Sequence, residues 1–259
     1  MASEKSTLAP SDFKDEKVKS SSASVNSVST TETLVDNAHF KPNRSLFIDA
    51  KGIRLIRLPV NSSETEIPIF SSDGTLAYVS TRERKCSSSA VLSSPKGGDL
   101  VSTTYFFGPG RNPVIQQLDQ SPDSKASGPV SVTGKWTSRS TTFVMPDGKT
   151  FEWSYVRSKQ EDGKTRTLLV LHQQNDGSGA SATSGRRIAQ LVRSAETRPQ
   201  GSSKHHAGNG GELVLDEDSV EWLDEPMIVA TCILMLKKEI DRRRLLQMAV
   251  LAGGAGGGS

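Results

Sequence analysis

The lysines and arginines of this sequence have the types and spacing that best suit one kind of chemistry, which is the binding of an anion. Arginine offers a planar fork of N–H donors that matches phosphate oxygens, and lysine offers a point charge. The candidates lie on or beside neighbouring expected strands, so we expect some of them to converge on one outer face and to meet a phosphate head group. The alternative is a solvated exterior with scattered cross-strand ion pairs. These candidates are Lys135, Arg139, Arg157 and Arg166, with Arg186 and Arg187 extending the set; Arg111 is a separate candidate.

Arg111 follows two glycines and a proline in the stretch FFGPGRNP at 106–113. Such a stretch can form a nest of backbone N–H groups that holds an anion. A tight turn between two strands explains it equally well. The stretch lacks the GxxxxGK[ST] spacing of a phosphate-binding P-loop, and a dinucleotide-binding motif requires a βαβ unit. We therefore expect no nucleotide cofactor.

Catalytic and metal-binding patterns are weak. His205 and His206 lie in a Gly/Ser-rich stretch without a nearby third ligand, which disfavours a metal site. No GxSxG elbow or comparable nucleophile context is present. Cys86 and Cys232 are the only cysteines, and the second lies in an apolar segment, so neither a structural disulfide nor a cysteine-based zinc site is expected. The sequence predicts a protein that is not an enzyme and has no metal or cofactor.

Charge is distributed unevenly along the chain, although the net charge is only +3. Residues 43–211 carry 22 Lys and Arg against 14 Asp and Glu, whereas residues 212–225 carry seven acids and no base. A basic middle region favours an anionic partner, but a diffuse excess of this size is more often the ordinary charge of a solvated surface. We expect no nucleic acid partner.

Twelve short stretches rich in β-branched and aromatic residues predict the elements that must position these side chains. Asp-Gly pairs at 72–75, 146–149 and 161–164 predict tight hairpins, because such turns need a residue with positive φ. Aromatic residues alternate with polar ones in FEWSYVR, which predicts one inward and one solvent-facing side. The twelve stretches are 45–49, 52–60, 66–70, 75–81, 100–107, 113–118, 131–136, 140–145, 151–157, 166–172, 187–192 and 212–215.

The stretch EPMIVATCILMLKKEIDRRR at 225–244 predicts a helix over about 225–248, with acids at its start and bases at its end. Its apolar part, 226–236, is too short to span a membrane, which requires about 20 residues. Apolar residues cover every direction around the axis, so the helix must be enclosed on all sides. The bases that follow can meet an acidic membrane, but a helix C-terminus alone explains them. We predict a mainly β fold, a closed antiparallel barrel of about 12 strands around this central hydrophobic helix.

The expected organisation is a single domain between two tails. Residues 1–42 are rich in serine and poor in large apolar residues, which predicts a disordered tail. The domain spans 43–248 and contains polar insertions at 119–128, 173–185 and 195–211. Residues 249–259 are rich in glycine, and we expect them to form a flexible end. The N-terminus lacks the apolar core of a signal peptide, so we expect the protein in the cytoplasm, at a peripheral membrane or in the nucleus. We also expect a monomer.

With these elements in place, the chain resembles the tubby C-terminal-like superfamily, which includes LURP-one-related proteins and phospholipid scramblases, and it is similar to fungal tubby-like proteins of unknown function. The resemblance rests on the series of strands, the aromatic hairpin at 134–157 and the acid-capped helix at 223–244. It implies a 12-stranded barrel around a C-terminal helix. Tubby proteins bind phosphoinositides at a basic surface, but no lysine-arginine motif here matches theirs residue by residue.

Two functions follow as expectations. The first is a noncatalytic tubby-like binding or scaffold module that binds anionic phospholipid or phosphoinositide head groups at a peripheral membrane. The alternative is a protein-protein adaptor with a phosphorylatable disordered tail and no lipid binding.

Overall fold

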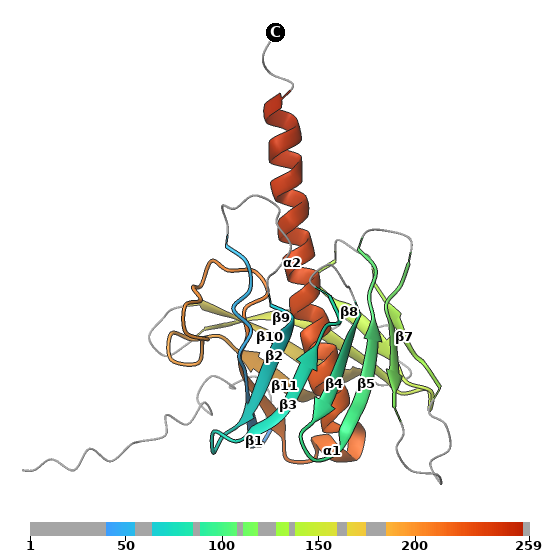
Figure 1. The fold of residues 1–259 in the computed structure, drawn as a ribbon. Helices are drawn as coiled ribbons and strands as arrows, with labels where there is room; N and C mark the ends of the chain where they lie inside the picture. Colours follow the sequence, from blue (N-terminus) through green and yellow to red (C-terminus); the bar gives the residue numbers. More distant parts are fainter. Residues whose placement is uncertain are drawn as a thin grey trace, which may run out of the picture. The chain divides into compact units, whose positions relative to one another are not determined.

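The computed structural model describes residues 40–54, 64–84, 89–107, 111–118, 128–134, 138–159, 165–174 and 185–255. These residues form twelve strands followed by two helices (Figure 1). The strands are β1 (Pro42–Ile48), β2 (Glu66–Ser71), β3 (Leu76–Thr81), β4 (Ala90–Ser94), β5 (Gly98–Thr104), β6 (Val114–Gln117), β7 (Val130–Thr133), β8 (Thr141–Val144), β9 (Thr150–Lys159), β10 (Thr165–Gln174), β11 (Arg186–Val192) and β12 (Gly211–Asp216). The helices are α1 (Ser219–Trp222) and α2 (Glu225–Ala255).

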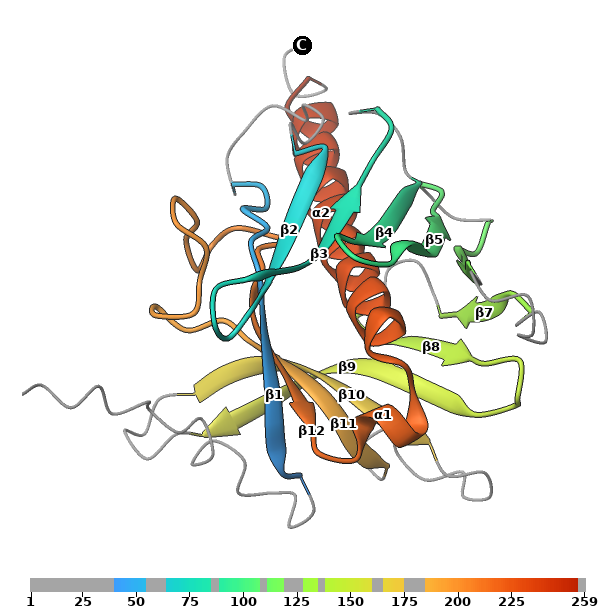
Figure 2. The ribbon, with the colours of Figure 1, turned by 60° about the horizontal axis from the view of Figure 1, so that its bottom comes forward.

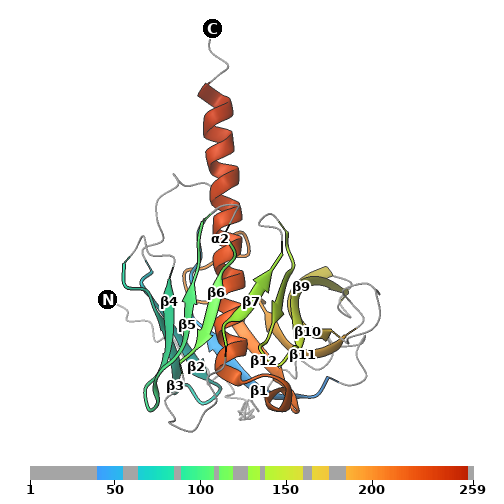
Figure 3. The same ribbon diagram turned by 90° about the vertical axis from the view of Figure 1, so that its right-hand side faces the viewer.

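The strands form a closed antiparallel barrel, as the sequence predicts. Each strand pairs with the next along the chain, and β1 closes the barrel by pairing with β12. In that closing pair, Leu46 lies opposite Leu213. Closure leaves no unpaired sheet edge. The strands surround α2 in the views of Figures 2 and 3.

Helix α2 occupies the interior of the barrel. Every side chain from Met227 to Leu236 is buried, and the apolar ones belong to one core cluster with inward-facing residues of the strands. An all-apolar helix surface explains this position, because no direction around the axis is suited to water. The one polar side chain in that segment, Thr231, accepts a hydrogen bond from the indole Nε1 of Trp153 at 3.0 Å and donates to the carbonyl of Ile228. No helix in the described ranges has an apolar segment long enough to cross a bilayer.

A smaller core lies on the outer side of the barrel. Leu168 and Val170 of β10 pack there with Phe40, Val192 and Val214. Because Leu169 and Leu171 point inward, both faces of β10 are buried, as expected for a continuous apolar run. The predicted solvent-facing side of β9 therefore needs correction: Glu152 is buried, and its carboxylate accepts a hydrogen bond from Gln174 at 2.6 Å.

The number of strands agrees with the prediction, but one predicted strand is missing among the described residues and one observed strand was not predicted. The sequence predicts a strand at 52–60, whereas of its described residues only Ile53 forms a bridge, to Ala207. Strand β4, AVLSS, was not predicted, because it is short and its serines resemble loop composition. Two Asp-Gly hairpins are confirmed by positive φ at Gly74 and Gly148; the third, at 161–164, lies outside the described residues.

The ends and insertions of the domain are described only in part. Residues 1–39, 119–127 and 175–184 lie outside the described ranges, so the predicted tail and first two insertions fall almost entirely there. The third insertion, 195–211, connects β11 to β12. Helix α2 begins at Glu225 as predicted but continues to Ala255, because Leu, Met and Ala carry the helix past residue 248.

Candidate functional site

A basic cleft lies where α2 leaves the barrel. Its lining comes from α2, from β9 and β10, and from the connection between β11 and β12, and its volume is about 880 Å³. Six Lys and Arg side chains line the cleft against one carboxylate, that of Glu239. The basic residues are Arg139, Arg193, Arg198, Lys204, Arg242 and Arg243.

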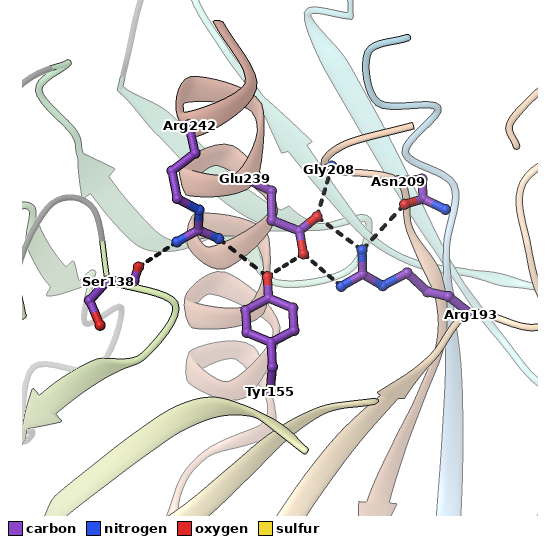
Figure 4. A network of polar contacts seen from close by, with 7 residues as sticks. All are labelled: Ser138, Tyr155, Arg193, Gly208, Asn209, Glu239 and Arg242. Atoms are coloured by element: carbon purple, nitrogen blue, oxygen red, sulfur yellow. Dashed lines mark hydrogen bonds and ion pairs between the residues drawn. The ribbon is translucent and has the colours of Figure 1, made fainter. Parts of the chain in front are cut away.

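Glu239 and Arg193 form a two-pronged ion pair in the basic cleft. The guanidinium of Arg193 donates to both carboxylate oxygens of Glu239, at 2.8 and 2.9 Å, and to the side-chain oxygen of Asn209 at 3.2 Å (Figure 4). The same carboxylate accepts the phenol O–H of Tyr155 and the backbone N–H of Gly208. Glu239 is thus fully engaged by donors, and its charge is neutralised by one arginine.

Gly208 allows the connection to lie directly against the helix. Its φ is +72°, and a Cβ at this position would lie 2.4 Å from a side-chain atom of Ile240 and 2.7 Å from the carbonyl oxygen of Leu236. Only glycine combines that backbone conformation with so close an approach. The contact fixes one wall of the basic cleft to α2.

Tyr155 holds two further arginines at the cleft. The guanidinium of Arg139 lies over its ring at 5.8 Å from the centroid, and that of Arg242 at 6.0 Å. Arg242 also donates to the phenol oxygen at 3.4 Å and to the carbonyl of Ser138. These contacts orient both cations by packing and hydrogen bonds while leaving them without a carboxylate.

Five of the six cations of the basic cleft have no ion pair with a carboxylate of the described residues: Arg139, Arg198, Lys204, Arg242 and Arg243. In addition, Nε of Arg198 and Nη1 of Arg243 are buried and make no hydrogen bond to any described residue. Buried donors are normally paired, so such atoms mark a place where a ligand can supply the acceptor. The cleft combines excess positive charge with unused donors.

The protonation states follow from these contacts. Burial by itself raises the pKa of Glu239, but Arg193 and the hydrogen bonds outweigh it and hold the pKa below its usual value. Burial also raises the pKa of Tyr155, and the neighbouring Glu239 raises it further. Glu239 therefore stays charged and Tyr155 neutral near pH 7. Neither group is suited to proton transfer there, whereas the cations suit anion binding.

Comparisons with known proteins add little to this geometry. No protein-family model matches the chain, and none of the curated proteins matches its sequence. Among solved structures, an X-ray structure of a protein from Arabidopsis thaliana is similar to this chain. The match covers 79% of this chain and 96% of the Arabidopsis chain, with 13% sequence identity and a TM-score of 0.31. A match this distant carries no argument about function.

The structure brings together only part of the predicted anion site. Arg139 lines the basic cleft, and Arg157 follows Tyr155 two residues later on the same face of β9, with an exposed side chain. Arg166 pairs with Ser158 through the backbone, but the placement of its side chain lies outside the described part of the chain, as does all of Lys135.

The other predicted cations lie away from the basic cleft. Arg186 pairs with Asp216 and Asp218, and its guanidinium lies over the ring of Trp222. Arg187 is buried, with its guanidinium over the ring of Phe40. Arg111 lies over the ring of Phe106 and does not line the cleft. These three arginines have local partners of their own.

Sequence reasoning missed most of the residues of the basic cleft. Arg198 and Lys204 lie within the predicted polar insertion at 195–211, and Arg193 lies two residues before it. Arg242 and Arg243 read as ordinary bases at a helix C-terminus. The available signal was that the insertion and the helix end are both basic, but nothing in the sequence places them side by side.

A second, smaller cavity of about 60 Å³ lies between α2 and strands β2 to β5. Ile67, Leu92 and Leu234 make its walls apolar, and Glu64, Arg82 and Lys237 give it a charged edge. No group of three or more potential metal ligands occurs among the described residues, and His206 donates from Nδ1 to the carbonyl of Lys51 at 3.0 Å. We take the basic cleft as the candidate site.

Lys238 predicts a pH effect on stability. It is buried and donates to the hydroxyl of Thr141, and burial, with Arg242 adding to it, lowers its pKa from 10.5 to about 8. Between these values the unfolded chain binds a proton that the folded chain does not, so this group makes the fold more stable as pH rises. We expect the free energy of unfolding of the wild type to increase relative to Lys238→Met between about pH 7 and pH 10, measured by urea denaturation. A constant difference across that range would contradict the assignment.

Proposed function

We propose that the protein is a noncatalytic binding module whose basic cleft holds the phosphate groups of an anionic lipid head group at a membrane surface. The observation that carries this proposal is the set of five cations without a carboxylate partner among the described residues: Arg139, Arg198, Lys204, Arg242 and Arg243. Phosphate oxygens are the acceptors that guanidinium and ammonium groups fit best.

The size and depth of the cleft support a head group with more than one phosphate. A volume of about 880 Å³ lies in the range of sites for small molecules. Buried donors of Arg198 and Arg243 have no acceptor among the described residues, and both residues line the cleft, so a phosphate bound there can supply one. The resemblance of the sequence to tubby proteins, which bind phosphoinositides at a basic surface, agrees with this ligand class.

Titration of inositol 1,4,5-trisphosphate into the wild type and into Arg198→Gln/Lys204→Gln tests the cleft. We expect wild-type binding that weakens with salt, because the attraction is electrostatic. Loss of two cations, each worth about 1 kcal/mol toward an anionic surface, predicts roughly 30-fold weaker binding in the double variant. The measurement is isothermal titration calorimetry.

Arg111→Gln is the matched control, since it removes an arginine that lies outside the cleft. It should bind like the wild type. Sedimentation with phosphatidylcholine vesicles that contain a phosphoinositide distinguishes a lipid head group from a free inositol phosphate: a lipid site binds both probes, and a metabolite site binds only the soluble one. No binding of either probe, or equal binding by the double variant, would contradict the proposal and favour a protein-protein adaptor.

A further inference from the structure

The last turns of α2 carry an apolar surface that the barrel does not cover. Figures 1 and 3 show these turns extending beyond the ends of the strands. Residues 245–252, LLQMAVLA, contain no charged side chain. Four of their large apolar side chains are exposed: Leu246 is 64%, Met248 43%, Val250 75% and Leu251 52% exposed. Single exposed apolar residues are ordinary, but four within six positions form a patch.

This patch continues directly from the basic cleft. Leu246 lines the cleft together with Arg242 and Arg243. Val250 follows Leu246 by four residues, which places it on the same face of the helix, one turn farther from the barrel. A single helix face therefore passes from Glu239 and the arginines in the cleft to apolar side chains outside it.

The order of these groups along the helix matches the order of layers in an anionic membrane. Phosphate groups lie at the surface, and the acyl chains begin just beneath them. Three consecutive arginines, 242–244, are followed by eight residues without charge. Eight helical residues extend about 12 Å, which reaches the boundary between head groups and acyl chains but does not cross a core of about 30 Å.

We propose that residues 245–252 of α2 insert into one leaflet of an anionic bilayer while the basic cleft holds a lipid head group. The inference rests on the proposed function of the cleft and adds the means of attachment. Head-group contact supplies the charge specificity, and the apolar turns supply the second attachment that stable membrane binding requires. The barrel then stands on the membrane with its cleft facing the lipid surface.

An environment-sensitive fluorophore at Val250→Cys tests the insertion. The background is Cys86→Ser, and Cys232 stays unlabelled because it is fully buried in the core. With phosphatidylcholine vesicles that contain about one-fifth phosphatidylserine and a few per cent phosphoinositide, we expect a blue shift and quenching by lipids brominated on their acyl chains. The same label at Ser72→Cys is the control and should not respond. Ser72 lies in the β2–β3 hairpin, near the opposite end of α2, where Tyr78 of β3 donates to Glu225.

A second variant separates the two proposals. Met248→Ser/Val250→Ser/Leu251→Ser changes only residues outside the basic cleft, so its binding of inositol 1,4,5-trisphosphate should equal that of the wild type. Its vesicle binding should weaken by about tenfold or more, since three apolar side chains no longer enter the lipid.

Three outcomes would overturn the inference. If the Val250 label stays in water while vesicles and inositol trisphosphate bind normally, the cleft acts alone and only the insertion fails. If the label shifts without vesicles as protein concentration rises, the patch binds a second copy of the chain. If neither vesicles nor inositol trisphosphate bind, the proposed function fails and the insertion fails with it.

Discussion

Val229→Asp should abolish folding of the barrel. Val229 is fully buried in α2 and belongs to the core cluster that the helix shares with the strands. An aspartate there places a carboxylate among apolar side chains, with no basic residue three or four positions away on the helix to pair with it. Burying an unpaired carboxylate costs an amount comparable to the whole stability of a domain, about 5–15 kcal/mol. We expect no cooperative unfolding transition by circular dichroism.

The same substitution at the other end of the helix is the matched control. Val250→Asp should leave the unfolding midpoint close to that of the wild type, because Val250 is 75% exposed. Val229→Ala, which removes apolar volume without adding charge, should lower stability and still fold. A folded Val229→Asp protein with an unchanged midpoint would mean that the barrel does not enclose α2.

Ile233 shows why the position within the helix matters. It is also buried, but it lines the smaller cavity with Arg82 and Lys237. A carboxylate at 233 would lie four residues before Lys237 and would share that cation with Asp241, which pairs with it at 3.1 Å. Ile233→Asp should therefore be less damaging than Val229→Asp, although both remove a branched apolar side chain from the same helix.

The central helix could be predicted because its sequence allows only one environment. Residues 227–236 offer no polar face, so enclosure follows from the sequence without any knowledge of the strands. The hairpins at 72–75 and 146–149 could be predicted for a similar reason, since Asp-Gly has a strong local preference. Strand β4 could not, because AVLSS becomes a strand only through its pairing with β3 and β5.

The candidate site could not be predicted because it depends on closure of the barrel. Arg193 and Glu239 are 46 residues apart, and Tyr155 and Glu239 are 84 residues apart. Gly208 is also part of the site, because its missing side chain lets the connection after β11 lie against α2. Of the predicted cations, Arg139 lines the basic cleft, whereas Arg186 pairs with acids at the end of β12 and just before α1 that no local pattern indicated.

Breaking the pair between Arg193 and Glu239 should be the most damaging change in the basic cleft itself. Their side chains are only 15% and 11% exposed, and the guanidinium donates to both carboxylate oxygens. Removing one partner of a buried ion pair leaves the other charge desolvated and unpaired, which costs about 3–5 kcal/mol. Since water reaches the cleft, we expect Glu239→Gln to cost about 3 kcal/mol, at the lower end of that range.

The double variant distinguishes a lost interaction from a general loss of packing. Arg193→Met/Glu239→Gln leaves no unpaired charge, so its free energy of unfolding in urea should lie above the value expected from adding the losses of the two single variants.

The pH dependence of stability supplies a second test of the pair. Because the folded chain holds the pKa of Glu239 below its unfolded value of 4.5, the pair stabilises the fold above about pH 4.5 and is lost as pH falls through the folded value. Glu239→Gln should remove that part of the acid sensitivity. Additive single variants, or an unchanged acid profile, would mean that Arg193 and Glu239 contribute separately and that the wall of the cleft does not depend on their pairing.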